Sequence, residues 1–151
     1  MANTIRRYAA PVFALLIGLA AMAAQAQHTP ETLSGTTLVT AEEVQKMMAS
    51  GVPVIDARVA NEYAEEHIKG AKNVPYKEKS AKSADFDASK DSFDVSKLPR
   101  DKSAPLVIYC NAGECWKSYK ASTAAIKAGY TKVYWLRGGI PEWKKKGLPV
   151  E

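Results

Sequence analysis

The chain has 151 residues with a net charge of +5, and it contains two cysteines and two histidines. This length fits one domain with a single hydrophobic core. Its positive charges form no stripe or run dense enough to indicate a nucleic-acid-binding protein. The densest run, WKKKG at residues 143–147, is typical of a solvated helix end, where cations interact favourably with the helix dipole.

The first 26 residues have the pattern of an export signal. Two arginines precede 17 largely apolar residues, Tyr8 to Ala24, a stretch slightly shorter than the roughly 20 residues that a membrane span needs. Residues 24–26, AQA, match the small-residue cleavage pattern. We expect a cleaved signal peptide at 1–26, with an uncleaved anchor as the alternative. The mature chain would be periplasmic, carry a net charge of +3 and have no stable membrane span.

Residues 27–36 are polar and rich in turn formers, which predicts a flexible lead-in before a domain at 37–151. The first helix is expected within residues 38–51. Thr40 and Glu43 have the spacing of a capping box, and Gly51 marks the helix end. The apolar residues between them recur at helical spacing, which indicates a buried stripe.

An apolar run at residues 52–58, VPVIDAR, predicts a buried parallel strand whose carboxyl end carries polar groups. A brief helix follows, with a turn at residues 69–70 and a short strand at 71–74. Residues 77–104 are charged and poor in large apolar side chains. They predict a mobile insertion with one short helix, anchored by Phe86, Phe93 and Leu98.

The second half of the chain alternates strands and helices. PLVIYC at 105–110 predicts a strand, residues 116–130 a helix, KVYWLRGG at 132–139 a strand and a glycine turn, and residues 140–150 a short closing helix. This alternation indicates an α/β domain with a mostly parallel sheet. Reactive groups gather at the carboxyl ends of the strands in such sheets. Asp56, Arg58 and Cys110 all fall there.

The two cysteines, Cys110 and Cys115, admit several interpretations. Their spacing matches neither C-x-x-C redox pairs nor haem attachment, and the chain has too few further ligands for a zinc site. Trp116 occupies the position where a phosphate-binding loop needs arginine. A nucleophile, a disulfide and a buried structural cysteine remain. Loop amides and a helix N-terminus converging on Cys110 would stabilise a thiolate.

Three segments together resemble a single-domain rhodanese, over nearly the whole mature chain. They are VIDARVANEYAEEHIKGAKNVPY, YCNAGECWKS and VYWLRGGIPEW. The matching residues are Asp56, Arg58, Glu62, Tyr63, His67, Ile68, Gly70, Ala71, Cys110, Gly113, Gly138, Gly139 and Trp143. The resemblance implies a rhodanese-like α/β fold, with a mostly parallel five-stranded sheet flanked by helices.

The resemblance also implies a sulfurtransferase in which the Cys110 thiolate carries sulfane sulfur from thiosulfate or a related donor to a thiophilic acceptor. That acceptor would be a small molecule or a protein, and no cofactor or metal is implied. The loop amides would surround the terminal sulfur. They belong to Asn111, Ala112, Gly113, Glu114, Cys115 and Trp116. Arg58 is expected to brace the loop and Asp56 to fix the strand end, or the two form a structural ion pair. We expect a structural role for His67.

The loop departs from the family pattern at Cys115 and Trp116. Cys115 is either a resolving thiol, able to expel the outer sulfur of a persulfide and leave a disulfide, or a packing residue. Glu114 would repel anionic donors, and Lys117 and Lys120 are expected to offset it. Two alternatives to the enzyme remain: a non-enzymatic rhodanese module that binds a partner, and a thiol-disulfide protein that uses both cysteines.

Overall fold

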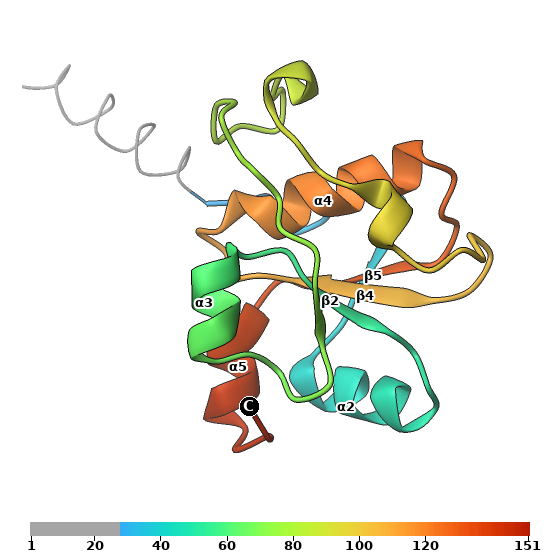
Figure 1. Ribbon diagram of the computed structural model, residues 1–151, viewed down its shortest axis with the longest axis vertical. Helices are drawn as coiled ribbons and strands as arrows, with labels where there is room; N and C mark the ends of the chain where they lie inside the picture. The colour runs from blue at the N-terminus through green and yellow to red at the C-terminus, as the bar shows by residue number, and fades with distance from the viewer. Residues whose placement is uncertain (1–27) are drawn as a thin grey trace, which may run out of the picture.

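The computed structural model describes residues 28–151, which form a five-stranded sheet with helices on both faces (Figure 1). The strand order is β1-β5-β4-β2-β3, and every neighbouring pair is parallel. Parallel strands require crossover connections, and helices supply most of them here. The expected α/β fold is confirmed, and the sheet is parallel throughout.

The strands and helices alternate along the chain. The strands are β1 Thr36–Leu38, β2 Val54–Asp56, β3 Lys72–Asn73, β4 Leu106–Tyr109 and β5 Val133–Leu136. The helices are α2 Ala41–Ala49, α3 Ala60–Glu65, α4 Trp116–Lys127 and α5 Gly139–Lys145. The predicted capping box is present at the start of α2, where Thr40 and Glu43 bond to each other's backbone amides.

The core lies in two layers, one on each face of the sheet. Alternating residues of β4 point to opposite faces: Leu106 and Ile108 pack with α4, whereas Val107 and Tyr109 pack with α2 and α5. All four are fully buried. The near-continuous apolar run that predicts this strand is thus explained, because a central parallel strand is covered on both faces.

The edge strand β1 has no hydrophobic pattern in the sequence. Its three residues, TTL, are mostly exposed, because β1 lies at one edge of the sheet beside β5. An edge strand has a neighbouring strand on one side only, so it does not need a continuous run of apolar residues. Thr36, the last residue of the predicted lead-in, therefore begins the sheet.

The charged insertion at 77–104 folds over α4 (Figure 1). It contains two short 3-10 helices, η2 Ala88–Lys90 and η3 Val95–Lys97, where the sequence predicts one short helix. Leu98 is buried in the α4 layer, and Phe93 packs against it. Phe86 contacts the aromatic cluster at the start of α4. The three expected anchors are therefore in contact with the core.

Between residues 28 and 151, no helix is long and apolar enough to cross a bilayer. The predicted signal peptide at 1–26 lies outside the described residues.

Candidate active site

Cys110 lies where the sequence places it, directly after β4 at the carboxyl edge of the sheet. Its side chain is fully buried, whereas Cys115, the N-cap residue of α4, is half-buried. A disulfide joins the two cysteines across the loop, with their Cα atoms 6.3 Å apart. The structure therefore shows the oxidised form of this loop.

The Cys110 sulfur also contacts Ser118, the third residue of α4. The Ser118 amide donates to Sγ of Cys110 at 3.2 Å, and the Ser118 hydroxyl oxygen lies 3.0 Å from the same sulfur. The indole N–H of Trp135, in β5, donates to that hydroxyl oxygen at 2.9 Å. Sequence reasoning stopped at Trp116 and missed Ser118. Its position in the first turn after the loop, where free amides lie, was the available signal.

A second set of contacts holds the loop from the side of the lead-in. Thr29, which is 3% exposed, donates from both its amide and its hydroxyl to the carbonyl of Gly113, at 2.7 and 2.9 Å. Arg137, just after β5, donates to the Thr29 hydroxyl, the Thr29 carbonyl and the Pro30 carbonyl. The start of the described chain is thereby packed against the active loop.

The glycine pair after β5 gives the backbone room beside Cys110. Gly139 has a φ of +59°, and a Cβ at this position would collide with the Cys110 carbonyl oxygen. That oxygen accepts a hydrogen bond from the amide of Ile140 at 3.1 Å. Only glycine allows α5 to begin this close to the cysteine.

Side chains on either edge of the loop have further partners. Asn111 donates to a carboxylate oxygen of Glu62, in α3, at 2.6 Å. Glu114 is exposed and lies 3.8 Å from His28. The Cys115 amide donates to the Ala112 carbonyl at 3.0 Å, which closes a turn within the loop.

Asp56 and Arg58 form a buried ion pair below the loop. The guanidinium donates to Asp56, with a shortest distance of 2.7 Å, and to the Glu66 carbonyl at the end of α3. Asp56 also accepts from the Tyr109 hydroxyl at 2.6 Å. Burial, together with the Asp56 charge, raises the pKa of Tyr109, so this hydroxyl stays a donor. Arg58 thus joins β2 to α3. Its hydrogen bonds fit the structural ion pair, the second of the two expected roles, and none of them reaches residues 110–116.

His67 belongs to the same supporting region. Its ring stacks on Tyr63 with centroids 3.7 Å apart, and its Nε2 lies 3.4 Å from Glu151. Its Nδ1 lies 2.8 Å from the Tyr63 carbonyl. These contacts fit the structural role expected for it.

An open pocket of about 300 Å³ adjoins the loop on the Cys115 side. Its lining comes from the insertion, the loop and the start of α4, and comprises Glu78, Lys82, Asn111, Glu114, Cys115, Trp116 and Lys117. The pocket brings together four of the six loop residues expected at the site. Of the two disulfide-bonded cysteines, Cys115 lines this pocket and Cys110 does not.

Lys120 does not line this pocket, contrary to expectation. Its side chain is fully buried, with the ammonium 2.8 Å from Glu78 and 2.8 Å from the Ser80 hydroxyl. Helical geometry turns residue 120 inward beneath the insertion, where it meets partners some 40 residues away in sequence. Its ammonium is instead paired with Glu78, whereas Lys117 and Lys82 line the pocket together with Glu114.

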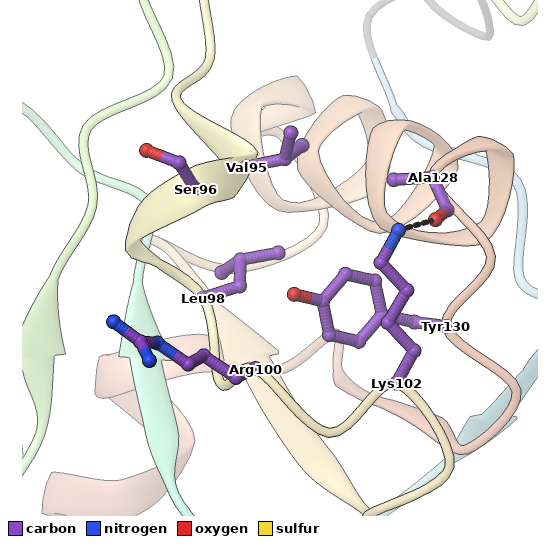
Figure 2. Close-up of a pocket in the computed structure, with 7 residues that line it drawn as sticks. All are labelled: Val95, Ser96, Leu98, Arg100, Lys102, Ala128 and Tyr130. Carbon is purple, nitrogen blue, oxygen red and sulfur yellow. Dashed lines mark hydrogen bonds between the residues drawn. The ribbon is translucent and has the colours of Figure 1, made fainter.

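A second pocket, of about 250 Å³, lies at the opposite end of α4 (Figure 2). Two of its polar groups bond to backbone carbonyls. The Lys102 ammonium donates to the Ala128 carbonyl at the helix end, and the Tyr130 hydroxyl donates to the Pro99 carbonyl. Because these residues precede β4 and β5, the pocket faces the amino edge of the sheet, away from Cys110.

No group of three or more His, Cys, Asp and Glu side chains within residues 28–151 is placed to hold a metal ion.

Comparison with known proteins identifies the family. Residues 40–146 match the rhodanese-like domain. The chloroplastic Thiosulfate sulfurtransferase 16 of Arabidopsis thaliana is 27% identical over 128 residues, 85% of this chain and 98% of that protein. Thiosulfate sulfurtransferase GlpE of Pseudomonas aeruginosa is 30% identical over 103 residues, 68% of this chain and 79% of that protein.

Solved structures share the fold. The BH2092 protein from Bacillus halodurans superimposes with a TM-score of 0.57 at 23% identity, covering 77% of each chain. This likeness supports the architecture, and the family match over most of the chain supports the relationship. The chain belongs to the rhodanese-like domain family, whose members similar to it include named sulfurtransferases.

Proposed function

We propose that this protein is a sulfurtransferase that carries sulfane sulfur as a persulfide on Cys110. The observation that carries the proposal is the position of Cys110: buried after a central strand, with the N-terminal turn of a 12-residue helix donating to its sulfur. Helix N-termini stabilise anions, and a persulfide is an anion near neutral pH. The named sulfurtransferases among its relatives support the same reading.

The cycle starts from the reduced loop. A dithiol reductant supplies two electrons to the Cys110–Cys115 disulfide and is itself oxidised to a disulfide. The Cys110 thiolate then attacks the outer sulfur of thiosulfate, whose S–S bond breaks, and sulfite leaves with the bonding electron pair. A thiophilic acceptor such as cyanide or a protein thiolate next takes the outer sulfur and regenerates the Cys110 thiolate.

Cys115 offers a second way out of the persulfide state. Its thiol attacks the inner sulfur of the Cys110 persulfide, the outer sulfur leaves as hydrosulfide with the thiol proton, and the loop returns to the disulfide. The protein would then release sulfide in the absence of an acceptor. The disulfide itself favours an oxidising compartment, and we propose export to the periplasm after cleavage of residues 1–26.

Intact-protein mass spectrometry tests the proposal. The reduced chain treated with thiosulfate should gain about 32 Da, reversibly with reductant, as a persulfide requires. Cys110→Ser should neither gain this mass nor transfer sulfur to cyanide, while its circular dichroism stays unchanged. A Cys110→Ser protein that still transfers sulfur at an appreciable rate contradicts the proposal.

A thiol-disulfide function is the second candidate, and the disulfide is the observation that favours it. It predicts a cycle of about 2 Da with reductant and oxidant and no sulfur uptake from thiosulfate. Cys115→Ala separates the two candidates, because it removes the redox pair and leaves the carrier intact. We expect this variant to form a persulfide that outlives that of the parent protein.

A further inference from the structure

Ser118 presents two donors to one buried sulfur. It is 2% exposed, with its amide 3.2 Å and its hydroxyl oxygen 3.0 Å from Sγ of Cys110. The amide direction is fixed by the helix backbone. Ser118 is the third residue of α4, so its amide has no intrahelical acceptor and is free to bond to the sulfur. The hydroxyl can rotate, and its partners decide where its proton points.

Trp135 determines the direction of the hydroxyl proton. The indole N–H is a donor only, and it reaches the Ser118 oxygen at 2.9 Å. The serine oxygen is therefore the acceptor in that bond, and its own proton is left for another acceptor. A Cys110 thiolate 3.0 Å away accepts hydrogen bonds and donates none. The chain of donors thus runs from indole to hydroxyl to sulfur.

We propose that Ser118 is a catalytic residue, holding the Cys110 sulfur as an anion through two hydrogen bonds, and that Trp135 is the positioning residue that orients its hydroxyl. The catalytic role of Ser118 rests on the proposed sulfur-carrier function of Cys110. The bonds to sulfur are required whenever Cys110 is charged, both as the free thiolate and as the leaving group from the disulfide.

This arrangement distinguishes the two cysteines of the loop. Cys115 is the N-cap residue, yet its side chain makes no capping hydrogen bond to α4. Cys110 has the Ser118 amide and hydroxyl. When an external thiolate opens the disulfide, it attacks Cys115, the half-buried sulfur beside the pocket. The S–S electrons pass to Cys110, which leaves as the stabilised thiolate, while Cys115 forms the mixed disulfide.

The same helix contains a matched control. Ser122 lies one turn beyond Ser118 and is also fully buried, but its hydroxyl has no hydrogen-bond partner among the described residues. Removing either hydroxyl makes the same chemical change in the same helix. Only Ser118 contacts the sulfur, so the two variants separate loss of that contact from loss of a buried serine.

The test measures how readily Cys110 ionises, independently of sulfur transfer. In the reduced Cys115→Ala chain, the rate of alkylation by iodoacetamide is followed against pH. Adding Ser118→Ala should move the midpoint upward by about one pH unit, as expected for loss of a hydrogen bond to a charged group. Ser122→Ala should leave the midpoint unchanged, and Ser118→Thr, which keeps a hydroxyl, should restore most of the shift.

Trp135→Phe provides a second measurement that leaves Ser118 in place. It removes the indole donor, and the smaller ring also leaves space in the aromatic cluster. The hydroxyl and amide of Ser118 stay in place, so the midpoint should rise by less than in Ser118→Ala. Equal midpoints for Ser118→Ala, Ser122→Ala and the parent would overturn the inference. Alanine favours helices more than serine does, so folding of Ser118→Ala is expected and is checked by circular dichroism.

The outcome is separable from that of the proposed function. A midpoint shift in Ser118→Ala, with no persulfide on the Cys115→Ala chain after thiosulfate, supports Ser118 as the residue that holds the Cys110 thiolate and rejects the sulfur carrier. A persulfide on the parent with no midpoint shift does the reverse.

Discussion

Two buried polar clusters on α4 lie only two residues apart in sequence, yet they are built differently. At Ser118 the groups are an amide, a hydroxyl and an indole, and they converge on the Cys110 sulfur. At Lys120 the groups are charged. The ammonium meets Glu78 at 2.8 Å and Asp91 at 3.8 Å, and it also donates to backbone carbonyls of the insertion.

The difference lies in what each cluster has to tolerate. The Cys110 sulfur is charged as a thiolate or persulfide and neutral in the disulfide. Neutral dipoles stabilise the charged forms and leave no unpaired charge when the disulfide forms. The Lys120 cluster takes no part in the sulfur chemistry and ties the insertion to the domain. Neutral donors therefore surround the Cys110 sulfur, whereas buried charge holds the insertion.

Removing the buried cation is expected to have the largest effect on stability. Lys120→Met keeps the length of the side chain but leaves Glu78 and Asp91 buried without their cation, at a cost of about 3–5 kcal/mol in the free energy of unfolding. Lys127→Met, on an exposed position of the same helix, is the control and should change it by less than about 0.5 kcal/mol. Urea denaturation measures both.

If Lys120→Met matches its control, buried charge does not hold the insertion. If the folded variant also loses persulfide formation at Cys110, the two clusters are coupled and the comparison between them fails.

Acid should weaken the same cluster. Burial alone would raise the pKa of Asp91, but hydrogen bonds from the Ser80 side chain and from the Lys79 and Ser80 amides outweigh it and hold the pKa well below its usual value. A carboxylate with a lowered folded pKa contributes stability above its unfolded pKa of about 3.9, and this contribution is lost as the pH falls further. Asp91→Asn should flatten the acid limb of a stability profile measured between pH 6 and 2.

Adding a methyl group beside Cys110 tests the backbone fit of the loop. Gly139→Ala would place a Cβ against the Cys110 carbonyl, and Gly147→Ala is the matched control. Both glycines have positive φ, at +59° and +67°, but the space around Gly147 is open. The control should lose about 1–2 kcal/mol from backbone strain. Gly139→Ala should lose more, and it should slow persulfide formation because α5 must move off the loop.

The sequence predicts those features that neighbouring residues determine. The capping box of Thr40 and Glu43 and the apolar run of β4 depend on residues within a few positions, and both appear where expected. Cys110, at the end of that run, is placed correctly for the same reason. The spacing of the two cysteines left several roles open, and their disulfide became visible only in three dimensions.

Contacts between distant segments could not be read from local patterns. Lys120 looks like a solvated residue of an amphipathic helix until the insertion covers it. Arg58 was expected at the loop, but its partners at Asp56 and Glu66 lie at a strand-to-helix junction. Thr29 bonds to Gly113 and Arg137, which are 84 and 108 residues away in sequence. Composition alone therefore predicts a flexible lead-in.

The smallest expected effect comes from Thr29, whose hydroxyl donates to Gly113 and accepts from Arg137. Thr29→Val keeps the shape and the two backbone bonds but removes both hydroxyl contacts, which should cost about 1 kcal/mol. The control is Thr36→Val, which loses a hydroxyl bond to Leu33 in the lead-in. Thr29→Val should be destabilised more than its control, because it loses two hydroxyl contacts and the control loses one.

Only Thr29→Val should slow persulfide formation. The rate should fall by about fivefold if the whole loss of about 1 kcal/mol is added to the activation free energy of that step. Stopped-flow mixing of the reduced chains with thiosulfate, quenched for mass spectrometry, gives the rates. Equal rates for both variants would mean that the loop keeps its shape without the Thr29 hydroxyl. The bond from the Thr29 amide to the Gly113 carbonyl and the bond from the Arg137 guanidinium to the Thr29 carbonyl would then be sufficient, so the loop would depend on the Thr29 backbone and not on its hydroxyl.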